Sequence, residues 1–181
     1  MNYATIKNND IANGPGVRVS LFVSGCTHQC PGCFNEEAWD FAYGKPFTQE
    51  TVESILKMLE PPHIKGLTLL GGEPFEPQNQ PEIVKLLRQV KKIYPEKSVW
   101  AFSGYLFDDI LSGKLGPKEI AQEYLQYLEV LVDGPFVIAQ KDMTLRFRGS
   151  ANQRLIDVQS SLKKGEVVLW EDWQGNGRGM M

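Results

Sequence analysis

The sequence is poor in cysteine and histidine and has no long apolar run. Only 3 of its 181 residues are cysteine and 2 are histidine. An odd cysteine count cannot complete a disulfide framework, which argues against a secreted, disulfide-stapled domain. No apolar run approaches the roughly 18 residues of a membrane helix, and the N-terminal MNYATIKNND is polar where a signal peptide is apolar. We therefore expect a cytoplasmic protein with no membrane partner.

The sequence also lacks an excess of either charge. Its 19 Lys and Arg stand against 22 Asp and Glu, for a net charge of -3. The basic footprint of a nucleic-acid-binding protein is missing, so we expect a small-molecule or protein partner and no nucleic acid. With 42% hydrophobic residues and no linker or repeat, the chain is predicted to be a single domain over residues 1–181. A C-terminal extension from about residue 159 has no assigned role.

All three cysteines lie in one short stretch, SGCTHQCPGCFNEE, at Cys26, Cys30 and Cys33. Thiolates at this spacing, in a loop with glycines that let it curl, can converge on one soft metal centre. Three ligands are one fewer than a zinc ion or a 4Fe-4S cluster takes. Either His28 or His63 completes a structural zinc site, as in an interaction module, or an external molecule fills the fourth position. We favour the external ligand.

Apolar strands alternate with amphipathic helices along the chain. The helix after residue 46 has Thr48 as its predicted N-cap, and the region 105–125 holds one or two helices broken by glycine and proline. Strands are predicted at residues 17–24, 65–72, 99–102, 127–134, 154–158 and 165–171, the last two bracketing a polar segment. The Thr48-capped helix lies within 46–62, and one further helix is predicted within 81–96.

This alternation predicts an α/β fold with right-handed crossovers and a parallel sheet. Eight strand-helix units need about 250 residues, so a chain of this length is expected to form an incomplete, open (β/α) barrel. The candidate site residues all follow strands directly: the cysteine loop, Gly71–Pro74, Ser103 and Asp133. In parallel architectures these positions meet on one face.

The spacing Cys-x3-Cys-x2-Cys, followed one strand-helix unit later by Gly71-Gly72-Glu73-Pro74, resembles the radical S-adenosylmethionine superfamily. The resemblance implies that the cysteines hold three irons of a 4Fe-4S cluster and that S-adenosylmethionine chelates the fourth. It also implies that the GGEP turn contacts the amino group of that cofactor. Glu73 then either supplies negative charge near the sulfonium or fixes the loop.

Five segments extend the resemblance across roughly residues 3–154 to the activating proteins of anaerobic ribonucleotide reductase. They are NGPGVRVSLFVSGCTHQCPGCFN, LGGEPFEPQN, VWAFSGY, VLVDGPF and RFRGSANQR. This family implies electron transfer from a reduced flavodoxin-like donor, cleavage of S-adenosylmethionine to methionine and a 5'-deoxyadenosyl radical, and a glycyl radical on the large catalytic subunit of the reductase. A radical enzyme acting on a small metabolite or precursor peptide is the rival interpretation.

Other cofactor contacts are predicted beside the cluster. Gly32 and Phe34 are expected to pack against adenine, although Phe34 equally fits a core position. Ser103 is expected to bind a ribose hydroxyl or the methionine carboxylate, with a simple turn serine as the alternative. Asp133 ends an apolar strand, where a carboxylate is costly unless used or solvated, so a role near the cofactor or the incoming glycine loop is expected.

Two alternative roles are predicted for Arg18 and two for the arginines near Gly149. Arg18, between apolar residues, either pairs with a surface carboxylate or contacts the cofactor carboxylate. Arg146, Arg148 and Arg154 surround Gly149 and either form surface ion pairs or dock the large reductase subunit. The final GNGRGMM is expected to be a loose tail.

Overall fold

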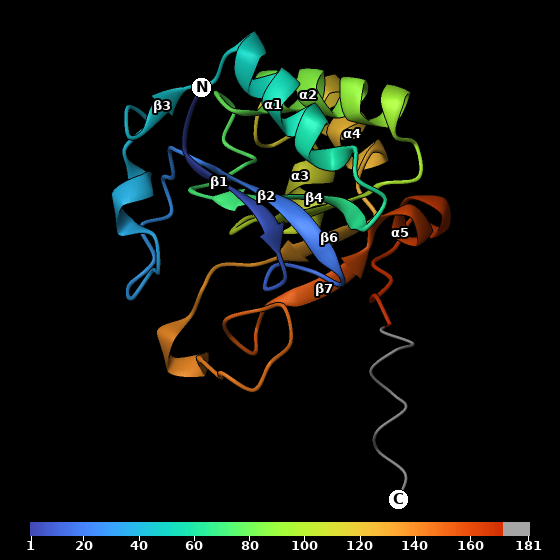
Figure 1. Ribbon diagram of the computed structural model, residues 1–181. Coiled ribbons are helices and arrows are strands. Elements are labelled where there is room, and N and C mark those ends of the chain that lie inside the picture. The colour runs from blue at the N-terminus through green and yellow to red at the C-terminus, as the bar shows by residue number, and fades with distance from the viewer. Residues whose placement is uncertain (172–181) are drawn as a thin grey trace, which may run out of the picture.

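The computed structural model describes residues 1–171, which build a mixed seven-stranded sheet in the order β3-β1-β2-β4-β5-β6-β7 (Figure 1). The strands are β1 (Asn2–Asp10), β2 (Val17–Val23), β3 (Lys45–Pro46), β4 (Ile64–Gly71), β5 (Ser98–Phe102), β6 (Val130–Asp133) and β7 (Arg154–Asp157). Strands β2, β4, β5 and β6 pair in parallel, whereas β1, β3 and β7 pair antiparallel. The α/β class is thereby confirmed. The prediction of a parallel sheet holds for these four strands only, because β7, from the predicted strand 154–158, pairs antiparallel with β6.

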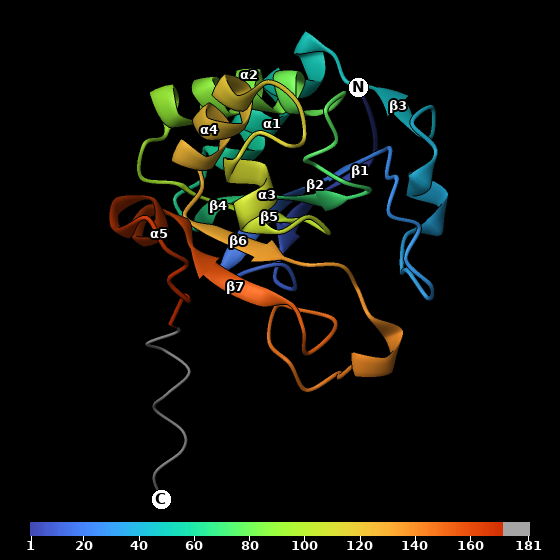
Figure 2. The same ribbon diagram turned by 180° about the vertical axis from the view of Figure 1, so that it is seen from behind.

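Over residues 1–171 the sheet is accompanied by five α-helices. They are α1 (Gln49–Leu59), α2 (Gln80–Ile93), α3 (Phe107–Leu111), α4 (Lys118–Gln126) and α5 (Val158–Lys164). Figures 1 and 2 show α1 to α4 stacked on the same side of the strands. Helix α1 begins at the predicted N-cap, because Thr48 and Thr51 form a reciprocal capping box. In the described chain no helix is both long and apolar enough to cross a membrane.

The two faces of the sheet are packed differently. On β2, Val19, Leu21 and Val23 are fully buried against the helices. Side chains alternate along a strand, so the neighbouring residues point to the opposite face. There Trp100 anchors a second, smaller cluster with the half-buried Phe147. Among residues 1–171 no layer of α-helices covers this second face, which the 134–153 segment partly covers, below the sheet in Figure 1.

Most predicted elements are confirmed, two predictions need correction, and two strands, β1 and β3, were not predicted. The polar segment 159–164 belongs to helix α5, which Asp157 caps by accepting from the Ser160 N–H. Residues 165–171 do not form a strand, because Leu169 alone among them makes a β-bridge, to Ile156. Strand β1 was not predicted, since its polar, half-exposed residues carry little apolar alternation. The predicted loose tail lies outside the described residues.

Candidate functional site

The cysteine loop and the GGEP turn join where β2 and β4 end. The Gly72 N–H donates to the Val23 carbonyl, and the Glu73 N–H donates to the Gly25 carbonyl, both at 2.8 Å. A Cβ on Gly72 would lie 2.6 Å from the Gly25 oxygen and 2.8 Å from the Ala38 oxygen. Glycine at position 72 is therefore required by the close approach of two backbones.

Glu73 is a buried carboxylate, 1% exposed, with partners on three segments. Its Oε1 accepts from the Phe75 N–H (2.8 Å) and the Ser103 hydroxyl (2.9 Å). Its Oε2 accepts from the Gly104 N–H (2.7 Å) and lies 3.1 Å from His28 Nε2. Four partners use most of its accepting capacity, so of the two roles predicted for Glu73 the geometry favours fixing the loop.

Glu76 and Asn79, which carried no role in the sequence-based prediction, complete this attachment. The buried Glu76 accepts at one carboxylate oxygen, Oε1, from the Thr27 N–H (2.7 Å) and the Thr27 hydroxyl (2.6 Å). The Asn79 side-chain amide donates to the carbonyls of Ser24 (3.0 Å) and Glu73 (3.1 Å). The signal that could have indicated these two residues is the polar run in residues 76–80, between the GGEP turn and the following helix.

The three cysteines are free and partly exposed. The Cys33 N–H donates to the Cys30 carbonyl at 3.1 Å, which places these two residues on one tight turn. Burial raises the pKa of the Cys26 thiol to about 11, so a thiolate there needs a nearby positive charge such as a metal. Within residues 1–171 no three His, Cys, Asp or Glu side chains stand in metal-binding geometry.

The donor set nevertheless suits an iron–sulfur cluster. Three thiols without disulfide partners are soft ligands, and metal bonds themselves organise such loops on binding. Neither histidine stands ready as the fourth ligand. The Nε2 of His28 faces Glu73, which raises the pKa of this imidazole, and His63 Nε2 lies 2.9 Å from Asn9 at the opposite, amino-terminal end of β4.

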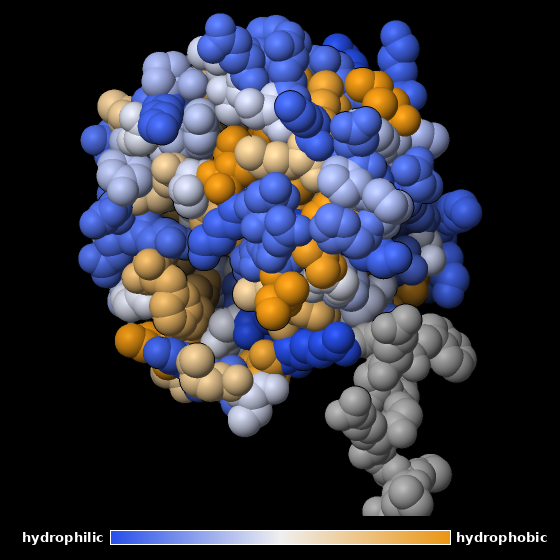
Figure 3. All heavy atoms as spheres, in the orientation of Figure 1, coloured by the Kyte–Doolittle hydropathy of each residue, from blue (hydrophilic) through white to orange (hydrophobic). Residues whose placement is uncertain are grey.

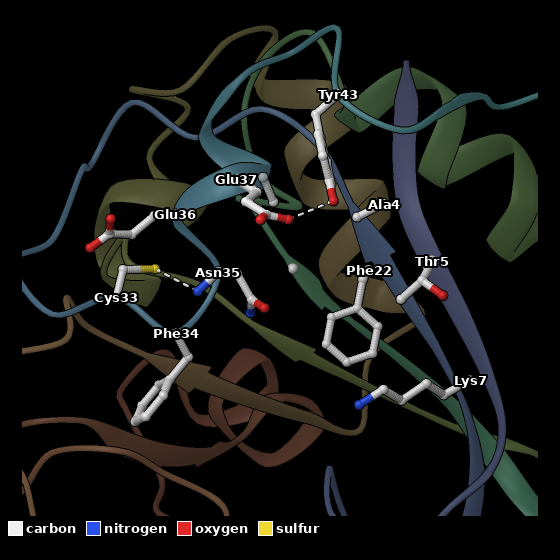
Figure 4. A pocket seen from close by; sticks show the side chains of 12 residues that line it. Ala4, Thr5, Lys7, Phe22, Cys33, Phe34, Asn35, Glu36, Glu37 and Tyr43 are labelled. Atoms are coloured by element: carbon white, nitrogen blue, oxygen red, sulfur yellow. Dashed lines mark hydrogen bonds between the residues drawn. The ribbon is translucent and has the colours of Figure 1, made fainter.

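Two adjoining cavities, of about 550 and 540 Å³, open beside Cys33. Both are lined by Cys33, Phe34, Phe22 and Lys7. Figure 4 shows the Cys33 and Phe34 side chains on one side of the first cavity and those of Phe22 and Lys7 on the other. Phe34 is 65% exposed, so the alternative that it packs in the core is wrong.

Gly32 lies against the loop that follows β6. It has a φ of +74°, and a Cβ there would lie 2.7 Å from Ile138 Cδ1. The Phe34 ring packs against Phe136, with centroids 5.6 Å apart, and under the Lys141 ammonium at 5.1 Å. The exposed half of the cysteine loop therefore borders the 134–150 segment.

Ser103 and Asp133 are placed at the same edge of the sheet but are engaged by protein groups. Ser103 is buried, donates to Glu73 and accepts from the Tyr105 N–H at 3.0 Å. Asp133 is fully buried and accepts from the Arg154 guanidinium at 2.9 and 2.6 Å, a pairing that raises the pKa of Arg154. Neither arrangement leaves an oxygen without a protein partner.

The structure contradicts both roles predicted for Arg18, the surface ion pair and the contact with the cofactor carboxylate. Arg18 is 1% exposed and donates to Thr68 Oγ1 (2.8 Å), to Ser98 Oγ (2.9 Å) and to backbone carbonyls, and no carboxylate is among its hydrogen-bond partners. It lies near the start of β2, away from the cysteines. Burial lowers the pKa of Arg18 to about 10. Its role is to hold β2, β4 and β5 together.

The cysteine loop carries three free thiols and is bound to a glycine–glutamate turn at the carboxyl ends of parallel strands, a donor set typical of an iron–sulfur protein. Residues 12–156 match the family described as a 4Fe-4S single cluster domain. The chain is 41% identical over 155 residues to the anaerobic ribonucleoside-triphosphate reductase-activating protein of Escherichia coli K12, covering 84% of this chain and 96% of that protein.

Relatives of the same name come from other sources. The protein of enterobacteria phage T4 is 43% identical over 157 residues, covering 86% of this chain and 93% of its own length. That of Vibrio cholerae is 41% identical over 155 residues, covering 84% and 96%. The chain belongs to the family of anaerobic ribonucleoside-triphosphate reductase-activating proteins.

Proposed function

We propose that Cys26, Cys30 and Cys33 bind three irons of a 4Fe-4S cluster and that S-adenosylmethionine binds the fourth. The chain is an oxidoreductase that activates the anaerobic ribonucleotide reductase, with this cluster and S-adenosylmethionine as cofactors. The cofactors supply the reductive cleavage of S-adenosylmethionine to methionine and a 5'-deoxyadenosyl radical, which creates the glycyl radical on the reductase. The observation that carries the proposal is the junction of the cysteine loop with the Gly71–Glu73 turn.

The protein residues around the cluster then have separate tasks. The backbone of the Gly71–Glu73 turn contacts the amino group of the cofactor, and Glu73 holds that backbone in place. The two glycines admit the neighbouring backbone of β2 and the cysteine loop, which brings the turn and the loop together. Gly32 and Phe34 border the space for adenine, with Phe34 on the wall of both cavities. We place Ser103 one contact further from the cofactor than Glu73, where its hydroxyl donates to Glu73 and orients it.

Asp133 is proposed as a second positioning residue. Its carboxylate joins β6 to β7 through Arg154 and accepts from the Phe107 N–H of α3 at 2.8 Å. It thereby shapes the base of the segment after β6, which borders the cavities, without touching the cofactor.

The fold supports the more specific proposal of an open radical S-adenosylmethionine barrel. Four parallel strands have helices on one face, and the two end strands β3 and β7 are not paired with each other in the described part of the chain. We also propose that residues 1–181 form one domain, since Val158 of α5 is buried in the main core. A reduced flavodoxin-like protein is the proposed electron donor.

Anaerobic reconstitution with iron and sulfide tests the cluster assignment. We expect a brown protein that cleaves S-adenosylmethionine when reduced, and a Cys30→Ala variant with no cleavage. Cleavage by the Cys30→Ala variant at the wild-type rate would overturn the ligand assignment. One zinc per chain with no iron after anaerobic purification would establish the zinc-stapled alternative instead.

The substrate is tested by electron paramagnetic resonance. A glycyl radical signal should appear on the large reductase subunit after incubation with the reduced protein and S-adenosylmethionine. Cleavage without this signal would favour the small-metabolite or precursor-peptide enzyme.

A further inference from the structure

We propose that two exposed apolar residues, Ile138 and Met143, and the lysine between them, Lys141, form the docking surface for the reductase polypeptide around its target glycine. These three residues are called the apolar rim. This inference rests on the proposed function, because that function requires a second protein to bring a backbone carbon to the cofactor. The partner chemistry is an extended segment that carries apolar side chains and at least one carboxylate.

The apolar rim concentrates exposed apolar surface in one loop. Ile138 is 57% exposed and Met143 is 81% exposed, both within the 134–150 segment. Figure 3 shows apolar residues gathered at the lower left of the molecule, over this segment. Exposed apolar side chains that gather in this way mark interaction sites, whereas isolated ones are ordinary.

The apolar rim is continuous with the cluster site. Ile138 Cδ1 lies 2.7 Å from the position of a Cβ on Gly32, the residue before Cys33. The Lys141 ammonium lies 5.1 Å from the ring centroid of Phe34, which lines both cavities. A polypeptide that reaches the cavity beside Cys33 from this side therefore has to cross the apolar rim.

The second cavity, next to the apolar rim, has an apolar floor and a cationic edge. Phe22, Leu70 and Phe102 line it from the open face of the sheet. Its charged lining residues, Lys7 and Arg148, are both cations. Lys141 adds a third positive charge beside them, so an acidic segment of the reductase is complementary to this edge.

Ile93 provides a matched control. It ends helix α2, is 52% exposed and belongs to the helical face, on the side of the sheet away from the 134–150 segment (Figure 1). Ile138→Asp and Ile93→Asp therefore make the same chemical change at similar exposure, one inside the apolar rim and one outside it.

The experiment uses the reconstituted holoenzyme and the intact large catalytic subunit under anaerobic conditions. We expect Ile138→Asp and Met143→Asp to weaken binding of the large subunit at least tenfold, and Ile93→Asp to change it less than twofold. Lys141→Glu should weaken binding and reduce its dependence on salt. Cleavage of S-adenosylmethionine without the reductase should remain at the wild-type rate in Met143→Asp and Ile93→Asp.

Three results would overturn the inference. The first is unchanged binding in all apolar rim variants. The second is an equal loss with Ile93→Asp. The third is loss of self-association rather than reductase binding, which would make the surface a contact between two copies of this chain.

If the wild type binds the large subunit but never cleaves S-adenosylmethionine, the proposed function fails while the docking surface stands. Lys141→Glu keeps the test decisive if an aspartate variant misfolds.

Discussion

The two halves of the cysteine segment are held in different ways. In residues 24–29, side chains of the turn after β4 bind the loop at three points: Asn79 at Ser24, Glu76 at Thr27 and Glu73 at His28. In residues 30–35, the hydrogen bonds are local, as in the turn between Cys30 and Cys33. The first half is anchored to the sheet, and the second is open to cofactor and partner.

This difference follows from burial. Glu73 and Glu76 are 1% and 4% exposed, and a buried carboxylate is tolerated only when several donors satisfy it. Their donors come from the cysteine loop and from the loop after β5, so satisfying the carboxylates also fixes those loops. The second half of the segment has no comparable buried group and keeps its freedom to close around a cluster.

The largest expected effect tests whether both halves are needed for the cluster. Cys26→Ala, in the anchored half, and Cys33→Ala, in the open half, should each lose S-adenosylmethionine cleavage below detection, because a cluster with two protein ligands is not retained. Iron and sulfide content and the electron paramagnetic resonance of the reduced protein measure this. A Cys33→Ala variant that keeps a full cluster would show that the open half is dispensable.

The next largest effect is expected at Glu73, whose hydrogen bonds hold the first half of the cysteine segment. Glu73→Gln replaces an acceptor oxygen by an amide that faces existing donors, so we expect about 3 kcal/mol lower free energy of unfolding. Urea denaturation of the cluster-free protein measures it. Glu82→Gln, which removes an exposed ion pair to Lys85 on α2, is the control and should cost below about 1 kcal/mol. Equal losses would contradict the anchoring role.

A smaller effect isolates the contact between Glu76 and Thr27. Thr27→Val removes one hydroxyl donor and should cost about 1 kcal/mol. In a double-mutant cycle with Glu76→Gln, we expect a coupling energy of about 1 kcal/mol, since the two groups are in direct contact. A coupling energy near zero would mean that the Thr27 hydroxyl does not hold the loop.

The smallest effect is expected in the open half. Asn35 is exposed, and its backbone N–H rather than its side chain contacts the Cys33 sulfur. Asn35→Ala should therefore change the free energy of unfolding by less than about 0.5 kcal/mol. If it costs as much as Thr27→Val in the same urea titration, the contrast between the halves is wrong.

The main elements of the fold were predictable because their signals are local. Thr48 caps α1 as expected, and the apolar runs of β2, β4 and β6 mark strands buried in the parallel sheet. Strand β1 escaped prediction because its pairing with β2, rather than its own residue pattern, makes it a strand. Helix α5 was missed because its polar sequence is stabilised by Asp157 and by docking of Val158.

The sequence by itself determined the chemistry: three soft ligands at fixed spacing, a glycine–glutamate turn one strand later, and their meeting at the carboxyl ends of neighbouring parallel strands. Only the tertiary structure decided which polar groups hold that site together and which remain open. Arg18 and Asp133 have their partners across the sheet, and Glu76 reaches Thr27 from 49 residues away. Long-range pairing of buried charges depends on how the chain packs, so no local pattern encodes it.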